Sequence, residues 1–330
     1  MMNMNWKSMS AFMAVIFGVM AIMPLFVGGS DHLMHILIMC LIWAVVASCW
    51  DLIMGFAGIF SFGQVAFFVI GAYASAIFSI QFGINPVAAM LLAGMVAAAC
   101  GILVGLPCLR LKGAYIALVT FAVHMILEPF LKSGMGRAIG TGGSQGIMTI
   151  PPMELFGIVF SADNKIAVFY AALLLAVVCS IIIMLVIRSF WGTAFLAITD
   201  SKDFAASLGV SAFRHKLVVF ALTSFLTGLA GAFYGHYVGM LSTRMLGIDL
   251  FVMLMIMLVI GGIGKFPGAI LGAIITVTAN EMLAPLGPYR PLILGAMVVV
   301  LVLLLPDGII GLVRRFIPGK TPADSGSPSG

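Results

Sequence analysis

Side chains capable of chemistry are few in this sequence, and their spacing predicts no catalytic site. A nucleotide-binding Walker A loop needs Gly-x4-Gly-Lys-Ser/Thr, so that backbone amides cradle the phosphates. The nearest match is Gly264-Lys265-Phe266, which lacks the Ser/Thr and has Val259 in place of the first glycine. The sequence therefore predicts no nucleotide hydrolysis, no catalytic residue and no cofactor bound by this chain.

Metal-ligating side chains are also not grouped. His32 and His35 have the i, i+3 spacing of one helix face, but only Asp31 stands beside them, and the five histidines form no HExxH motif. No CxxC pair occurs, so we expect no metal site. We expect the cysteines to be free thiols in apolar surroundings; they are Cys40, Cys49, Cys100, Cys108 and Cys179.

Three carboxylates, Asp51, Glu128 and Glu281, lie within apolar stretches. Charged groups inside membrane spans are functional candidates by default. Each of the three stands near the end of its stretch, which favours helix anchoring or interhelix hydrogen bonding. The alternative is proton coupling in a carrier driven by an ion gradient.

The elements that position these residues are membrane helices. Hydrophobic residues make up 63% of the 330 residues and charged residues only 8%, against roughly 45–50% and 25% in globular domains. The composition predicts an all-α integral membrane protein with about ten spans, eight or nine being alternatives, in one transmembrane domain over residues 1–319. The apolar stretches are 9–27, 33–54, 62–80, 86–106, 113–131, 166–187, 217–241, 249–264, 267–284 and 291–312.

Basic residues predict the orientation, because Lys and Arg concentrate in cytoplasmic loops. With ten spans and both termini in the cytoplasm, eleven basic residues lie inside and five outside. The inside set is Lys7, Arg110, Lys112, Arg188, Lys202, Arg214, Lys216, Lys265, Arg314, Arg315 and Lys320. The outside set is Lys132, Arg137, Lys165, Arg244 and Arg290. This scattered charge favours a lipid bilayer and not nucleic acid as the partner.

Two connecting segments are long enough to hold structure. The external loop 132–165 is rich in glycine, and Pro151-Pro152 follow. The cytoplasmic loop 188–216 has helix-favouring residues, with Gly209 where a helix would end. We expect the tail 320–330, rich in Pro, Ser and Gly, to be disordered.

The loop 188–216 has the properties of a docking element. Phe195, Ile198, Phe204 and Leu208 are expected to form an apolar face for a soluble partner, although a plain connection is an equal alternative. Small residues recur every four positions at Gly231, Gly235 and Gly239 and at Gly264, Gly268 and Gly272, a spacing that lets helices approach closely in lipid. Tight packing is the simpler interpretation, and a moving helix contact is the other.

Several stretches together resemble branched-chain amino acid ABC transporter permeases of the LivM type. They occur in family order, and the ordered set is more specific than any one stretch. They are residues 55–73 (GFAGIFSFGQVAFFVIGAY), 110–120 (RLKGAYIALVT), 141–146 (TGGSQG), 192–210, 228–234 (GLAGAFY), 260–264 (IGGIG) and 306–308 (PDG).

The resemblance implies a bundle like that of type II ABC importers, in a bacterial inner membrane. Such permeases pair with a LivH-type permease, two ATPase subunits that use ATP and Mg, and a periplasmic binding protein. Family members import branched-chain amino acids, and relatives carry urea, amides or aromatic acids. The resemblance therefore implies a transport subunit that is not itself an enzyme.

The resemblance also implies roles for three sets of residues. The ATPase-coupling loop comprises Arg188, Gly192, Ala194, Ala197, Ile198, Asp200, Ala205, Ala206, Leu208 and Gly209. The translocation pathway comprises Gly55, Gly58, Ser61, Gly63 and Gln64, where glycines are expected to interrupt a helix; packing glycines are the alternative. The external loop that meets the binding protein comprises Thr141, Gly142, Gly143, Ser144 and Gln145, with a surface loop without function as the alternative.

This sequence departs from the family in the coupling loop. Thr193, Leu196 and Thr199 stand where members commonly carry arginines, while Asp200 keeps the acidic position. We therefore expect a less basic docking face and carry over no specific salt bridge.

Overall fold

The computed structural model describes residues 6–27, 30–111, 113–155, 158–160, 164–304 and 308–309. Within these residues the chain is almost entirely helical, as the composition predicts. The side chains of Asp200 and Phe204, and all of Lys112 and the tail 320–330, lie outside what the structure describes.

Seven helices are long and apolar enough to cross a membrane. Each coincides with an expected stretch to within a few residues at its ends. They are α1 (Trp6–Val27), α2 (Asp31–Asp51), α3 (Gln64–Gln81), α4 (Pro86–Cys108), α5 (Ala114–Lys132), α7 (Lys165–Arg188) and α10 (Ala212–Val238).

The other three expected spans are shorter helices. They are α11 (Ile248–Gly261), α12 (Gly268–Met282) and α13 (Arg290–Leu304). The expected span at 249–264 extended too far into the connection with α12, because the apolar run continues through Gly262 and Ile263, which lie outside α11. Ten of the described helices therefore match the ten expected stretches, and seven of these ten have full spanning length.

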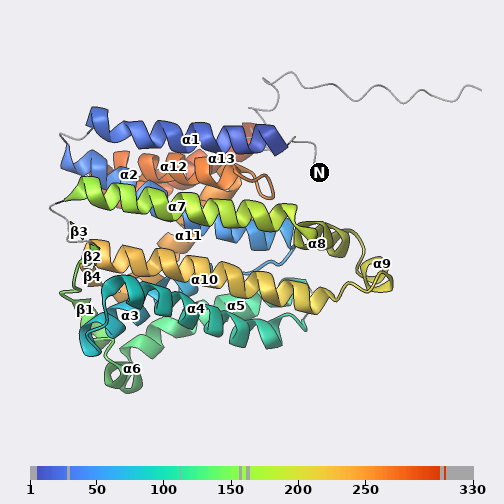
Figure 1. Cartoon of the computed structure of the whole chain (residues 1–330), viewed down its shortest axis with the longest axis horizontal. Helices are drawn as coiled ribbons and strands as arrows, with labels where there is room; N and C mark the ends of the chain where they lie inside the picture. The colour runs from blue at the N-terminus through green and yellow to red at the C-terminus, as the bar shows by residue number, and fades with distance from the viewer. Residues whose placement is uncertain are drawn as a thin grey trace, which may run out of the picture.

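The connections contain short elements at both ends of the bundle. Figure 1 shows the long helices side by side, with α8 and α9 projecting at one end and α6 and the strands at the other. These elements are α6 (Gly134–Ile139), α8 (Phe190–Asp200), α9 (Lys202–Ser207), β1 (Ile147–Met148), β2 (Met153–Leu155), β3 (Ile158–Phe160) and β4 (Met240–Leu241). Single turns of other helix types are η1 (Leu52–Phe56), η2 (Gly143–Gln145), η3 (Thr243–Leu246) and η4 (Ala284–Tyr289).

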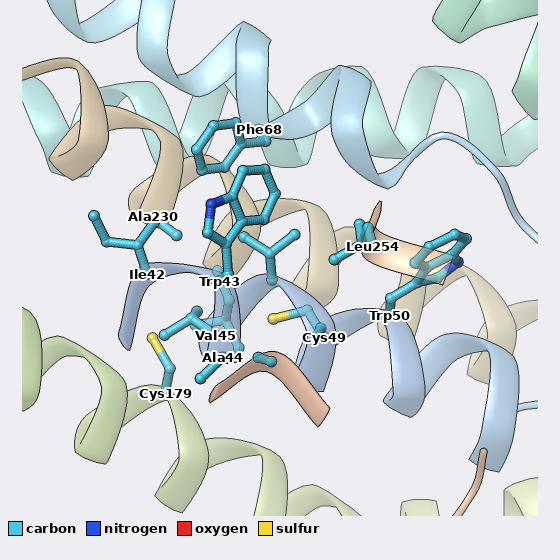
Figure 2. Packing of buried hydrophobic residues seen from close by; sticks show 14 of the residues in the cluster. Ile42, Trp43, Ala44, Val45, Cys49, Trp50, Phe68, Cys179, Ala230 and Leu254 are labelled. Atoms are coloured by element: carbon cyan, nitrogen blue, oxygen red, sulfur yellow. The ribbon is translucent and has the colours of Figure 1, made fainter. Parts of the chain in front are cut away.

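Helix α2 is the centre of the bundle, and its residues from Cys40 to Asp51 are all buried. Figure 2 shows its Trp43 stacked on Phe68 of α3, with Ala230 of α10 and Cys179 of α7 nearby. The two stacked rings lie 5.2 Å apart between centroids. A helix that is apolar on all sides lies in a protein core or in lipid. The burial of α2 places it in the core, where it packs mainly against α7, α10 and α12.

Small residues set the closest helix contacts, as the sequence predicts. A Cβ placed on Gly231 of α10 would overlap the carbonyl of Phe68, and one on Gly272 of α12 would overlap that of Met257. Gly231 and Gly272 therefore pack helices in this structure, whereas Gly264 lies in the turn between α11 and α12 with φ +71°. Gly239 does something different, because it ends α10 in a left-handed conformation.

Candidate functional site

The backbone between α2 and α3 leaves the α-helix inside the bundle. Residues 52–56 form a π-helical turn, and residues 57–63 are not helical. Gly58 adopts φ +62°, a left-handed conformation that side chains with a Cβ rarely take. The expected interruption of the helix is thus present. We name residues 57–63 the unwound segment.

Polar groups from neighbouring helices hold the unwound segment in place. The indole Nε1 of Trp50 donates to the carbonyl of Ser61 at 2.6 Å. The backbone N–H of Phe62 donates to Oγ1 of Thr120 on α5 at 2.9 Å. Backbone groups released from a helix at membrane depth need such partners, because lipid offers none.

Gln64 fixes the start of α3 against the middle of α10. Its Nε2 donates to Oγ1 of Thr227 at 2.7 Å and lies 3.4 Å from the carbonyl of Thr223. Thr227 is about 22 Å along α10 from its start at Ala212, at a rise of about 1.5 Å per residue. The unwound segment therefore lies at membrane depth.

The five expected pathway residues come together around this segment, but their side chains do not all face open space. Ser61 and Gln64 are buried among helices of this chain, and Gly63 is buried with them. Within residues 57–63 the exposed side chain is Phe60, at 52%. The open face of the unwound segment is therefore at Phe60, which the sequence did not single out.

Asp51 joins the end of α2 to the connection between α11 and α12. Its Oδ1 accepts the backbone N–H of Gly264 at 2.6 Å, and its side chain is almost fully buried. Gly55 lies against the same backbone, where a Cβ would overlap the Gly264 nitrogen. Asp51 thus makes an interhelix hydrogen bond, which is the first of the two expected roles.

The other two carboxylates serve helix ends. Glu128 pairs with Lys132 at 2.6 Å in the last turn of α5, and both side chains are exposed. Glu281 lies 3.5 Å from the guanidinium of Arg290. Such surface pairs contribute little stability, and their placement agrees with anchoring.

The loop 188–216 holds the two helices α8 and α9, and the spanning helix α10 begins within it. Ser189 caps α8 by accepting the N–H of Trp191 at 3.2 Å. Gly209 ends α9 with φ +80°, as its position predicts. The loop is shorter than expected, because α10 begins at Ala212. The first turns of α10 carry the charged residues Arg214 and Lys216. The apolar stretch therefore began only at residue 217, and these turns were not expected to be helical.

The apolar face predicted for this loop is wrong in its composition. Phe195 and Ile198 are each 1% exposed and pack α8 onto this chain's own bundle. Leu208 is exposed as predicted, and the other exposed apolar side chains in the described part of the loop are Phe190 and Trp191. We name these three the exposed α8–α9 face.

The other expected coupling residues divide between the two sides of this loop. Gly192, Ala194 and Ala205 are buried, Arg188 and Ala197 are half-buried, and Ala206 and Gly209 are exposed.

Helix α8 also touches the unwound segment. A Cβ on Gly58 would lie 3.0 Å from Oγ1 of Thr199. The family resemblance implies an arginine at position 199, and Thr199 lies at this contact in its place. A displacement of α8 therefore reaches residues 57–63 without an intermediate helix.

The described part of the external loop is folded. Thr141 donates through Oγ1 to the carbonyl of Leu131 at 2.7 Å and accepts the N–H of Gly143. Strand β1 then pairs antiparallel with β4, joining this loop to the end of α10. Of the predicted contact residues, Gly142, Ser144 and Gln145 are exposed, and Thr141 and Gly143 are buried.

Residues 142–146 also spell the G-x-S-x-G pattern of a serine nucleophile. That pattern forms a nucleophile elbow only between a strand and a helix. Here Ser144 is exposed in η2, which precedes a strand. The described residues contain no group of three or more His, Cys, Asp or Glu side chains positioned to hold a metal.

The hydrogen bond between Gln64 and Thr227 can be tested by substitution. Thr227→Val keeps the shape but removes the hydroxyl that holds Gln64, and a buried polar group left unpaired costs about 1–3 kcal/mol. We expect solute uptake at equal membrane abundance to fall about tenfold, as that energy implies. Thr223→Val is the matched control, because Gln64 contacts its backbone carbonyl and not its hydroxyl. Equal uptake by the two variants would contradict the role given to this bond.

Comparisons with known proteins agree with this architecture. The family described as "Branched-chain amino acid transport system / permease component" matches residues 32–305. The LivM permease protein of the high-affinity branched-chain amino acid transport system of Salmonella typhimurium is 29% identical over 297 residues, which cover 84% of this chain and 69% of that protein. The corresponding Escherichia coli protein is 29% identical over 307 residues, covering 87% and 72%.

A second permease protein of the same transport system shows a shorter likeness. The Escherichia coli LivH protein is 26% identical over 125 residues, which cover 36% of this chain and 39% of that protein. No solved structure matches. The match over residues 32–305 includes the unwound segment, α8, α9 and the ten apolar helices except α1. This chain therefore belongs to the permease-component family of branched-chain amino acid transport systems.

Proposed function

We propose that this chain is the membrane-spanning permease subunit of an ATP-driven importer for branched-chain amino acids or a related small polar solute. The observation that carries the proposal is the family match over residues 32–305. The LivM relatives that align with most of the chain support the substrate class. In this proposal the chain guides the solute and performs no catalysis of its own.

The partners follow from this division of labour. A LivH-type permease completes the pore, two ATPase subunits use ATP and Mg, and a periplasmic binding protein delivers the solute. The existence of paired LivM and LivH permease proteins in one transport system supports the second permease. The exposed external residues Ser144 and Gln145 are the proposed contact with the binding protein.

The proposed orientation places α8 and α9 in the cytoplasm of a bacterial cell, with the inner membrane around the bundle. Basic residues support it, since Arg110, Arg188, Arg214 and Lys216 all belong to the end of the bundle that carries α8. Both termini are then cytoplasmic.

The coupling mechanism runs from the ATPases to the pore through contacts of this chain. A partner can shift the bundle between two states only by binding them differently. The exposed α8–α9 face receives the partner, and buried Phe195 and Ile198 transmit its movement to the bundle. Movement of α8 then presses Thr199 against Gly58. As a result, the unwound segment, with Phe60, changes position beside the solute path.

Substrate-stimulated ATP hydrolysis tests the function. The chain is reconstituted in liposomes with its permease partner, ATPases and binding protein, and hydrolysis is measured with and without leucine. We expect stimulation that depends on the binding protein. Uptake by this chain alone, with no ATPase present, would overturn the proposal in favour of a carrier driven by an ion gradient.

Substitutions of Asp51 distinguish an ATP-driven permease from a carrier driven by an ion gradient. The carrier alternative needs an ionisable group in the membrane, whereas the permease needs only an oxygen that accepts the Gly264 N–H. We expect Asp51→Asn to keep uptake within about twofold, because the amide oxygen preserves the acceptor. Asp51→Leu should destabilise the subunit by about 1–3 kcal/mol, because it leaves that N–H unpaired.

The measurement is uptake of labelled leucine at matched subunit abundance, together with the thermal unfolding midpoint. Loss of uptake in Asp51→Asn at an unchanged midpoint would favour proton coupling.

A further inference from the structure

A cavity of about 580 Å³ opens between α11, α12 and α13, at the end of the bundle opposite α8. One face of α11 lines it with Asp249, Val252, Met253 and Ile256, which follow helical spacing. Arg290 and Leu294 line it from α13. The cavity has no part in the proposed coupling, because neither the unwound segment nor α8 contributes to its wall.

The cavity is polar at its mouth and apolar at its floor. Asp249 and Arg290 stand in the first turns of α11 and α13, where these helices begin. Ile256 and Leu294 lie deeper along the same helices and are almost fully buried. Charged residues at the mouth and apolar residues at the floor match an amphiphile, which has a polar headgroup and an apolar chain.

The two charges differ in their surroundings. The Arg290 Nε donates to Oδ1 of Asn280 at 2.6 Å, and its Nη2 lies 3.5 Å from Glu281. These contacts fix the guanidinium and leave three of its five N–H groups for a ligand. Asp249 is exposed and has neither an ion pair nor a hydrogen bond in the described part of the chain.

The chemistry of the mouth selects a zwitterion. A phosphate would accept from Arg290, and a primary ammonium would donate to Asp249. Asp249 in the lining and Glu281 beside Arg290 outnumber the one guanidinium, which makes the mouth unfavourable for a ligand with net negative charge. The volume is that of a site for a ligand of drug size and exceeds what a single amino acid fills. Exposed Ile248 and Val252 open the cavity sideways along α11.

We propose that the cavity between α11, α12 and α13 binds a phospholipid with an amine headgroup. Its phosphate contacts Arg290, its ammonium contacts Asp249, and the start of an acyl chain lies on Val252, Ile256 and Leu294. Tyr289, exposed beside Arg290, belongs to the aromatic residues typical of this depth in a membrane. The lipid holds α13 against α11 from the membrane side.

Native mass spectrometry of the full chain, purified in detergent and stripped of lipid, tests this inference. Phosphatidylethanolamine and phosphatidylglycerol are titrated separately. We expect the ethanolamine lipid to bind at least about tenfold more tightly, as a charge-assisted hydrogen bond implies. Asp249→Asn should remove that preference, and Val252→Phe should weaken both lipids by filling the groove.

Two control variants should bind lipid as the unmodified chain does. Glu154→Gln changes an exposed carboxylate on β2, and Val19→Phe enlarges an exposed valine on α1, both outside the cavity. Equal binding of the two lipids, or tighter binding of phosphatidylglycerol, would overturn the inference. Displacement of the lipid by free leucine would overturn it as well and assign the cavity to the amino acid.

Discussion

Leucine in place of Gly71 prevents the subunit from accumulating in the membrane. Gly71 of α3 meets Gly228 of α10 backbone to backbone, and a Cβ there would overlap the Gly228 carbonyl. Inserting side-chain atoms into a packed contact costs about 1–3 kcal/mol when neighbouring side chains can shift. Backbone atoms cannot shift in this way, so α3 and α10 must separate.

Separation of these helices also dismantles the site. The bond from Gln64 to Thr227 joins the same two helices, and Phe68 packs between Trp43 and Tyr234. Membrane abundance by immunoblot and the unfolding midpoint of the purified chain measure the effect. We expect abundance to fall at least about tenfold, because a loss of several kcal/mol removes much of the roughly 5–15 kcal/mol by which a typical protein is folded.

Gly18→Leu is the matched control for this substitution. Gly18 is also a glycine within a spanning helix, but no atom lies within 4 Å of a Cβ placed on it. A glycine in a helix is worth about 0.5–1 kcal/mol less than alanine, so this variant should be at least as abundant as the unmodified chain. Similar losses from both substitutions would show that glycine itself, and not the contact with Gly228, matters.

The sequence predicted helices well because their signal is local. An apolar stretch of spanning length has one stable form in lipid, so α1 to α5, α7 and α10 stand where the stretches do. Gly209 was likewise predictable, since a helix end needs only its own residues. The glycines near 58 indicated the unwound segment for the same reason.

Contacts between distant residues were not predictable in this way. Asp51 and Gly264 are separated by 213 positions, and no spacing rule joins them. Thr120 and Thr227 were missed as well. A polar residue within an apolar stretch is the only signal that they carry, and it does not identify a partner.

The error at α8 has a specific physical cause. The pattern of Phe195 and Ile198 correctly indicated an apolar helix face. Periodicity does not reveal what covers that face, and here the chain's own bundle does. The residues left for a partner are Leu208, which the prediction included, and Phe190 and Trp191 at the start of α8, which it did not. A docking surface must therefore be read from exposure and not from amphipathicity.

Glutamate in place of Leu208 weakens docking of the ATPase subunits and lowers uptake, while the subunit remains in the membrane. Leu208 is 65% exposed beyond the end of α9, so its replacement leaves the fold of this chain intact. Removing an apolar anchor from a packed interface costs about 2 kcal/mol or more, roughly a thirtyfold loss of affinity. A carboxylate buried there without a partner adds to that cost.

The measurement is uptake and ATP hydrolysis by the complete complex in liposomes. We expect uptake to fall at least about tenfold at unchanged abundance, as weakened docking implies. Leu208→Met keeps the apolar contact and should retain uptake. Leu111→Glu changes another exposed leucine at the same end of the bundle, in the connection between α4 and α5, and controls for added charge.

Ala205→Glu does not test docking, because Ala205 is fully buried and the variant would misfold. Normal transport by Leu208→Glu would remove α9 from the docking surface and leave Phe190 and Trp191 of α8 as its remaining candidates.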